Sequence, residues 1–390
     1  MELNRHVHGD RHSETARSFL DFGYVHLDSY EFAEAEQAFR EALTIFRRAY
    51  GDDFHLWSAC ALRNLVFTLD AQYKDKEADA ITRECLAAWR KRDYSFQTGD
   101  LIPEMRGLAC DGRGDHADAE AHYRQAVEIS RKQPALFPNP LVLVHSFQLG
   151  GALFLQGKYE QARAAVEKFV PLARAASRQN KTPPLLLTPF AGLLLIGGSG
   201  GADDVQAALS LAQQGVDQSQ EEPPERRALA RFVLAVAQWK NGNRQRAIQL
   251  LREAQELPRP RATLERRLAE RALVQYLKEM GDLPAVEKAL REVLSQRQAA
   301  WPKVHPEIAA AQVNLGQFLT EQNQHNEAEP LLLAAYQSLK THSQADSPSL
   351  KRRRAETVER LVQLYDVSGR KEHAAKWRKE LEATKPAAKP

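Results

Sequence analysis

Apolar and polar residues recur along this chain with the spacing of paired helices. The clearest stretch runs from residue 19 to residue 43, where a first apolar stripe has helical three- and four-residue intervals: Phe19, Phe22, Gly23 and Leu27. Polar residues follow at 28 and 29, and a second stripe then appears at Ala35, Phe39 and Ala42. The pattern predicts two short helices joined by a tight turn. Small residues at 23, 35 and 42 would let the two backbones approach closely, with Phe39 filling the gap.

The same spacing recurs: a small residue, another twelve positions later, a bulky one four further on, and a small or apolar one three after that. The clear copies are Gly107, Ala119, Tyr123 and Ala126; Gly150, Ala162, Val166 and Phe169; Ala235, Ala247, Leu251 and Ala254; and Gly316, Ala328, Leu332 and Ala335. Weaker copies start at Val66, Val274 and Val362, and a distorted one lies around residues 192–212. The second helices are therefore marked by residues 35, 78, 119, 162, about 207, 247, 286, 328 and 374. A steady period near 40 indicates a stacked helical repeat.

This pattern resembles the tetratricopeptide repeat, a helix-turn-helix unit of about 34 residues. The longer period is similar to the variant found in kinesin light chains and many bacterial proteins. Two stretches resemble the connection and helices of that variant, at 301–309 (WPKVHPEIA) and 326–331 (NEAEPL). The resemblance covers nearly the whole chain and implies an all-α, right-handed superhelical solenoid of about nine helix pairs. It implies little about function, because such repeats serve many partners.

We expect one solenoid with an irregular section in its middle. The predicted parts are a connection or partial repeat at 1–13, repeats at 14–178, an irregular repeat and hinge at 179–222, repeats at 223–383 and a disordered tail at 384–390. The stretch 171–203, which overlaps this section, combines four prolines with the glycine-rich run 197–201. Residues 8–16 look like a connection between two repeats, so we expect either a longer polypeptide or a partner packed at this end.

Composition limits the partners that this chain can have. With 54 basic and 51 acidic residues the net charge is +3, which argues against a dedicated nucleic-acid-binding face. The three cysteines, Cys60, Cys85 and Cys110, form no Cys-x-x-Cys pair, so we expect small buried side chains in a reducing, cytoplasmic setting. The longest apolar run, 185–196, is too short to span a bilayer.

No catalytic, cofactor or metal site is expected. The chain has no Gly-x-Ser-x-Gly elbow and no His-Glu-x-x-His motif. The loop 197–201 lacks the Lys-Ser/Thr pair of a phosphate-binding loop. His6, His8 and His12 alternate near the start, but no second set of ligands accompanies them. We therefore expect a protein that is not an enzyme.

The inner face of the first helices is the candidate partner-binding surface, because the resemblance implies that these helices line the concave side. Positions expected to be exposed there combine aromatic and charged side chains, which suit peptide anchoring: Arg17, Leu20, Tyr24, Arg63, Phe67, Asp70, Phe147, Phe154, Phe232, Trp239, Arg271, Gln275 and Lys278. Each of them could equally serve packing between repeats. A second candidate is the basic run Lys351, Arg352, Arg353 and Arg354, within a segment from 351 onward that holds 12 basic and 6 acidic residues. The alternative is the solvated first turn of a helix.

The leading hypothesis is a non-catalytic scaffold that binds a peptide or protein segment along the inner face. An alternative is the partner-recruiting or sensor region of a bacterial signalling protein. The segments 361–365 (LVQLY) and 374–378 (AAKWR) resemble the last repeat of proteins in which such repeats follow a serine/threonine kinase domain. A third hypothesis is a helical regulator that senses a peptide and acts on a DNA-bound partner. The oligomeric state is not indicated.

Overall fold

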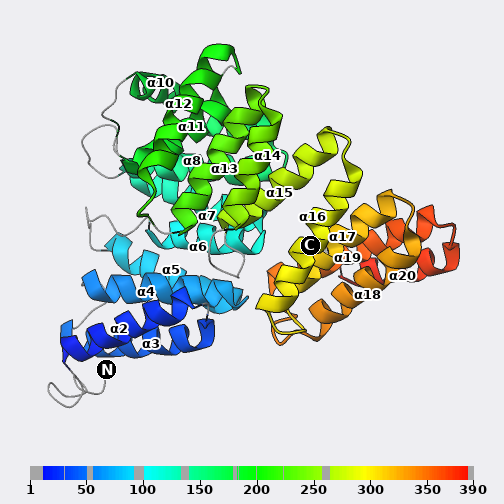
Figure 1. Ribbon diagram of the computed structural model, residues 1–390. Helices are drawn as coiled ribbons and strands as arrows, with labels where there is room; N and C mark the ends of the chain where they lie inside the picture. Colours follow the sequence, from blue (N-terminus) through cyan, green and yellow to red (C-terminus); the bar gives the residue numbers. More distant parts are fainter. Residues whose placement is uncertain are drawn as a thin grey trace. The chain divides into compact units, whose positions relative to one another are not determined.

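The computed structural model describes residues 12–29, 31–50, 56–91, 101–132, 140–178, 182, 184–198, 200–222, 224–256 and 264–384. All regular secondary structure in this part of the chain is helical (Figure 1). The chain divides into two compact units, 1–250 and 251–390, and each is described by itself.

Consecutive helices form nine pairs among the described residues, as the sequence predicts. The first helices are α2 (Ser13–Asp28), α4 (Leu56–Ala71), α6 (Leu101–Arg113), α8 (Pro140–Leu155), α11 (Pro184–Gly197), α13 (Pro224–Lys240), α15 (Leu264–Glu279), α17 (Pro306–Glu321) and α19 (Pro348–Val367). The second helices are α3 (Phe32–Tyr50), α5 (Asp75–Lys91), α7 (His116–Lys132), α9 (Tyr159–Val166), α12 (Ala202–Gln218), α14 (Arg244–Gln255), α16 (Leu283–Ala300), α18 (His325–Thr341) and α20 (Lys371–Thr384). In the fourth pair, α9 is continued by the 3-10 turn η1 (Glu167–Phe169) and by α10 (Val170–Ser177).

The predicted marker residues form the seam of the solenoid. In eight pairs the marker is the fourth residue of the second helix and has no exposed surface: Ala35, Ala78, Ala119, Ala162, Ala247, Val286, Ala328 and Ala374. In the fifth pair the connection 198–201 is one residue longer than in the fourth. Ala208 and Ala212 of α12 are both fully buried, and Ala208 lies next to the position expected from the period.

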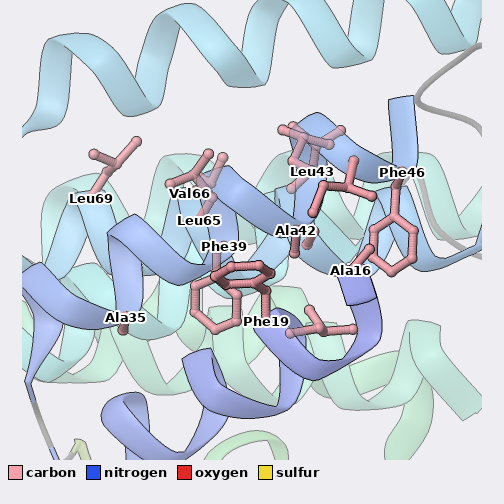
Figure 2. Close-up of a cluster of buried hydrophobic side chains, with 14 of the residues drawn as sticks. Ala16, Phe19, Ala35, Phe39, Ala42, Leu43, Phe46, Leu65, Val66 and Leu69 are labelled. Atoms are coloured by element: carbon pink, nitrogen blue, oxygen red, sulfur yellow. The ribbon is translucent and has the colours of Figure 1, made fainter. Parts of the chain in front are cut away.

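The small residue of each first helix is small because a bulky partner lies directly over it. A Cβ atom on Gly23 would lie 2.4 Å from Cε1 of Phe39, and one on Gly107 would lie 2.4 Å from Cε1 of Tyr123. Phe39 is fully buried in the core shared by the first two pairs (Figure 2). Close approach of the two helices in a pair, predicted from the sequence, is therefore confirmed.

In eight of the nine pairs, the described connection between the two helices includes a residue with left-handed backbone. Glycine supplies it in most pairs, for example Gly242 with φ 85°. Two pairs use other residues, Tyr73 with φ 63° and Asn323 with φ 59°. Tyr73 is 2% exposed and lies beneath the guanidinium of Arg113 at 4.8 Å, so tertiary packing holds an aromatic residue where glycine is the easier choice.

A glutamate directly after the marker joins neighbouring pairs by a repeated set of hydrogen bonds. Glu120 accepts from Gln156 Nε2 at 2.9 Å, at the end of the next first helix, and from Lys158 Nζ at 2.8 Å, just before the next second helix. Glu36 accepts from Gln72 and Lys74 in the same way. At the end of the chain, Tyr365 and Arg370 occupy these two places around Glu329, both at 2.6 Å.

Candidate partner-binding face

The structure places the predicted face residues on the first helices, with two classes of exposure. Five are exposed: Arg17, Phe154, Arg271, Gln275 and Lys278. Six are half-buried: Tyr24, Arg63, Phe67, Phe147, Phe232 and Trp239. Two further positions were expected to be exposed and are not, because Leu20 (1% exposed) belongs to the core and Asp70 (0%) belongs to a buried ion-pair network.

Two of the half-buried aromatic residues take part in packing between pairs. The hydroxyl of Tyr24 accepts a hydrogen bond from Asn64 Nδ2 at 3.0 Å, and its ring meets Phe39 edge-on. The ring of Phe147 lies against Gly192, where a Cβ atom would be 2.1 Å from its Cε2. Packing between repeats therefore buries most of the surface of Tyr24 and Phe147.

Phe154 is the most exposed aromatic residue of the predicted face. Its side chain is 45% exposed, and its ring meets that of Tyr159, which is 59% exposed, edge-on at 5.1 Å between centroids. Phe154 lies seven residues after Phe147 and therefore on the same side of α8. Phe154 and Tyr159 therefore form a pair of exposed aromatic side chains where α8 ends and α9 begins.

Helix α13 repeats the arrangement, since Phe232 and Trp239 are also seven residues apart. The guanidinium of Arg244 lies 5.4 Å from the centre of the Trp239 ring, where it forms a cation–π contact. Both α8 and α13 contact α11 within the first unit. We call the four residues Phe147, Phe154, Phe232 and Trp239 the aromatic face.

In the second unit the corresponding face is polar. Lys278 Nζ donates to Glu321 Oε2 at 2.9 Å and lies 5.6 Å from the ring centre of Phe318, so it links α15 to α17. Gln275 donates to Glu279 on its own helix. Arg271 is exposed on the same side of α15. Charge and hydrogen bonding, more than aromatic surface, characterise this part of the predicted face.

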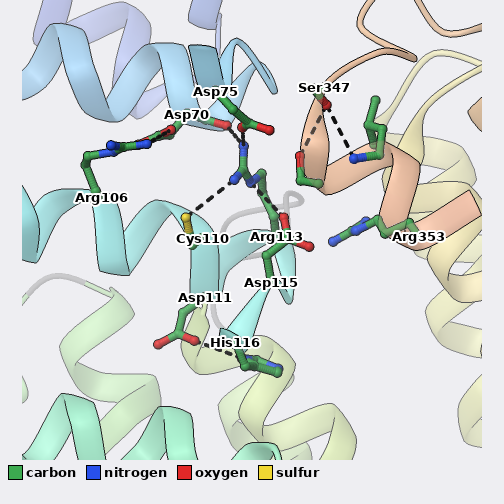
Figure 3. A network of polar contacts seen from close by, with 12 residues as sticks. Asp70, Asp75, Arg106, Cys110, Asp111, Arg113, Asp115, His116, Ser347 and Arg353 are labelled. Carbon is green, nitrogen blue, oxygen red and sulfur yellow. Dashed lines mark hydrogen bonds and ion pairs between the residues drawn. The ribbon is translucent and has the colours of Figure 1, made fainter. Parts of the chain in front are cut away.

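A buried polar network joins α4, α5, α6 and α7 and was not anticipated from the sequence (Figure 3). Arg106 contacts Asp70 in a two-pronged ion pair, with Nε at 2.8 Å and Nη2 at 3.2 Å, and also reaches Asp79 at 2.5 Å. Arg113 lies 2.9 Å from Asp75 and donates to the backbone carbonyl of Asp70. Burial raises the pKa of Asp70, and the Arg106 charge opposes that rise.

This network has a structural role. Its arginines are 5% exposed, and their donors meet side-chain and backbone oxygens across consecutive pairs. Cys110 lies inside it, 1% exposed, 3.4 Å from Arg113 Nη2. Burial raises the pKa of the Cys110 thiol, which keeps it protonated and unreactive. The expectation of a small buried side chain holds for Cys110, while Cys60 is half-buried and the side chain of Cys85 lies outside the described residues.

Sequence models of known families match four segments of the chain, all under the description "Tetratricopeptide repeat": 15–56, 104–133, 200–262 and 308–349. The first and last of these segments coincide with the first and eighth helix pairs and have the length of the period predicted above. This chain is a tetratricopeptide repeat protein. No curated protein matches it in sequence.

The tetratricopeptide repeat protein is similar to several solved structures at low sequence identity. One is a Rap protein complexed with Competence and Sporulation Factor, at 14% identity and TM-score 0.45, covering 95% of this chain and 98% of that one. Another is a tetratricopeptide repeat protein from Parabacteroides merdae, at 14% identity and TM-score 0.37, covering 86% and 97%. A third is the human IFIT1 dimer with PPP-AAAA, at 15% identity and TM-score 0.36, covering 93% and 88%.

The predicted basic run of this repeat protein is not a uniformly solvated patch. Lys351 is exposed and pairs with Asp346 at 3.1 Å, whereas the other three side chains are partly buried. Arg353 is 11% exposed and points toward Glu307 on α17, with Nη1 at 3.9 Å from Oε1. Positive charges near the N-terminus of α19 are unfavourable because they oppose the helix dipole. For Arg353, packing against α17 explains why such a charge is present.

One serine–histidine–glutamate arrangement occurs in the described part of the repeat protein. His145 Nδ1 lies 3.3 Å from Ser130 Oγ, and Nε2 lies 3.6 Å from Glu104 Oε2. Ser130 is 1% exposed and His145 is 0% exposed, and the serine hydroxyl donates to the carbonyl of Ala126. A substrate has no access to a nucleophile in this position, so the arrangement joins α6, α7 and α8 structurally.

No group of three or more histidine, cysteine, aspartate or glutamate side chains among the described residues is placed to hold a metal ion. Among the same residues, no helix combines the length and apolar character needed to cross a bilayer.

Proposed function

We propose that this tetratricopeptide repeat protein is a non-catalytic scaffold that binds an extended or helical peptide segment of a partner protein along the aromatic face. The observation that carries the proposal is the exposure of Phe154, which is 45% exposed beside Tyr159 on an otherwise well-packed pair. A few residues carry most of the binding energy at protein interfaces, and aromatic residues are common among them because they bury a large area at small entropic cost.

The half-buried residues of the aromatic face suit the same role. Phe147 is held in place by its contact with Gly192, so one ring of the face is rigid before binding. Trp239 combines an indole ring with the nearby Arg244 charge, a pairing that suits a segment with both apolar and acidic residues. Preordered side chains lose little entropy on binding, which favours affinity.

A selection of displayed peptides on the purified protein tests the proposal. We expect the selected peptides to lose at least about tenfold in affinity when Phe154 is changed to alanine, because one good aromatic anchor contributes about 1.4 kcal/mol or more. Phe22→Ala is the matched control, since Phe22 is 42% exposed but lies on a different side of its helix. Both substitutions should leave the unfolding temperature nearly unchanged.

Two results would contradict the proposal. One is a set of selected peptides whose affinity is the same for Phe154→Ala and for the unchanged protein. The other is an equal loss for Phe22→Ala and Phe154→Ala, which would indicate non-specific adhesion to exposed rings.

A further inference from the structure

The first helix pair differs from the other eight in the exposure of one surface. In α2, Phe22 directly precedes the small residue Gly23, and Val25 follows it by two positions. Phe22 is 42% exposed and Val25 is 60% exposed. At the same two positions of the other eight pairs the residues are between 0% and 7% exposed, for example Leu65 and Thr68 in α4. The equivalent surface is therefore covered in every other pair.

In the fourth pair, the second helix of the preceding pair covers this surface. Leu149 and Ala152, at the same two positions of α8, share a core cluster with Tyr123 of α7. In the same way α3 contributes to the core cluster that surrounds α4 (Figure 2). No described helix precedes α2. Phe22 and Val25 thus occupy a contact surface between pairs that no described pair covers.

The ring of Phe22 has a fixed position before any contact forms. It meets the ring of His26 edge-on at 4.2 Å between centroids. His26 Nδ1 in turn lies 2.6 Å from Oε2 of Glu31, directly before α3. A preordered side chain loses little entropy when it is covered, which favours association.

The last helix of the described chain presents a different kind of surface. The exposed residues described in α20 are charged, except for His373 and Ala375. A polar outer face is usual for a terminal repeat, because no neighbour covers it. An apolar face in the same situation indicates a surface at which another helix packs.

The exposed stripe of α2 has the same pattern of sizes in both directions. Ser18, Phe22, Val25 and the C-cap residue Ser29 are spaced by four, three and four residues, so they line one side of the helix. The two bulky residues lie in the middle and the two serines at the ends. An antiparallel pair of identical helices needs this symmetry, because each copy meets the other in reverse order. We call these four residues the α2 seam.

We propose that the α2 seam is the contact surface of a two-fold symmetric dimer, in which α2 of a second copy of this chain takes the covering role. Phe22 of each copy then lies against Val25 of the other. The buried surface is small, so the dimer is weak, with a Kd on the order of 10–100 µM. At about 1 µM the chain is monomeric, so Phe22→Ala remains a control for peptide binding at the aromatic face.

Sedimentation equilibrium of the full chain between about 1 and about 200 µM tests the proposal. We expect a monomer at the lowest concentration and a dimer at the highest, with no larger species because a two-fold contact closes on itself. Val25→Glu should raise the Kd of the dimer at least about tenfold, because it places a charge in the middle of the seam. Val367→Glu is the matched control, since Val367 is a valine of similar exposure, 56%, at the end of α19.

A mixture of two variants tests whether the two α2 helices face each other. Val25→Glu and Val25→Lys should each be monomeric alone, because equal charges repel across the two-fold axis. An equimolar mixture of the two should associate at least about tenfold more tightly than either variant by itself. Loss of folding cannot produce this result, because association is restored and not removed.

Four results would overturn the proposal. A full chain that stays monomeric at about 200 µM would mean that another occupant, such as residues 1–11 or a different protein, covers the seam. A dimer that Val25→Glu leaves intact, or that Val367→Glu weakens equally, would place the contact elsewhere. A mixture of the two charged variants that stays monomeric would show that the α2 helices do not face each other.

Discussion

Neighbouring glycines in α8 have opposite roles in the structure, so substituting each by alanine tests the packing of the repeat. A Cβ atom on Gly150 would lie 2.8 Å from Cγ1 of Val166, while one on Gly151 would have no atom within 4 Å. Both residues lie within the helix, so alanine gains the same helix propensity at each, about 1 kcal/mol. The difference between the two variants therefore isolates the contact with α9.

The magnitude follows from the geometry. An ordinary contact needs at least about 3.4 Å, so Val166 or its helix must move by roughly 0.6 Å or more. Val166 is fully buried and β-branched, which restricts its side chain to nearly one rotamer in a helix. Overpacking of this kind costs about 1–3 kcal/mol. Gly151→Ala should stabilise by up to about 1 kcal/mol, and Gly150→Ala should be about 1–3 kcal/mol less stable than Gly151→Ala.

Urea unfolding followed by far-UV circular dichroism measures both variants in the same unit of the protein. A third variant completes the test, because Val166→Ala removes the atom that the new Cβ would meet. In that background Gly150→Ala should become neutral or stabilising. Equal midpoints for Gly150→Ala and Gly151→Ala would refute the reasoning, and so would a penalty for Gly150→Ala that is unchanged by Val166→Ala.

Three further predictions concern the polar junctions and turns. Burial by itself raises the pKa of Glu120, but hydrogen bonds from Lys158, Arg124 and Gln156 outweigh it and lower the pKa from 4.5 to about 2. Glu120 therefore stabilises the fold above about pH 4.5 and loses this effect as the pH falls toward 2. Glu120→Gln should cost about 1–2 kcal/mol at pH 7 and progressively less between about pH 4.5 and pH 2, whereas the exposed control Glu128→Gln should cost little at any of these pH values; a penalty that stays constant down to pH 2 would contradict the linkage. Arg113→Met should lower the free energy of unfolding by about 3–5 kcal/mol in urea titrations, because it leaves Asp75 and Asp115 buried without their cation; a loss below about 1 kcal/mol would show that the network is dispensable. In calorimetry, Asn323→Gly should be neutral or slightly stabilising and Gly281→Ala should cost about 1 kcal/mol, since both residues have positive φ; effects of the same sign would contradict the turn assignment.

The residues of the predicted face show how much of a binding surface can be predicted from the spacing of residues along the chain. Spacing placed Phe154, Arg271 and Lys278 on the exposed side of the first helices, and they are exposed. The same spacing selected Leu20 and Asp70, which are buried. Their exposure depends on what the next pair places over them, for example Arg106, which is 36 residues beyond Asp70. Periodicity gives the side of a helix on which a residue lies but not what covers that side.

Some of the missed features had a signal in the sequence. A glutamate follows the marker alanine at Glu36, Glu120 and Glu329, and its partners recur one repeat later. The period alone would have allowed this junction to be predicted.

By itself the sequence determined the helix pairs, their number and their period, and the small residues at which two helices meet. These properties depend on contacts within a pair, where residues some 12–19 positions apart are brought together by a short turn. Tertiary structure alone decided which charges are buried and which aromatic rings remain exposed. Those outcomes depend on contacts between pairs, whose partners are set by how the helices cross and not by the spacing along the chain.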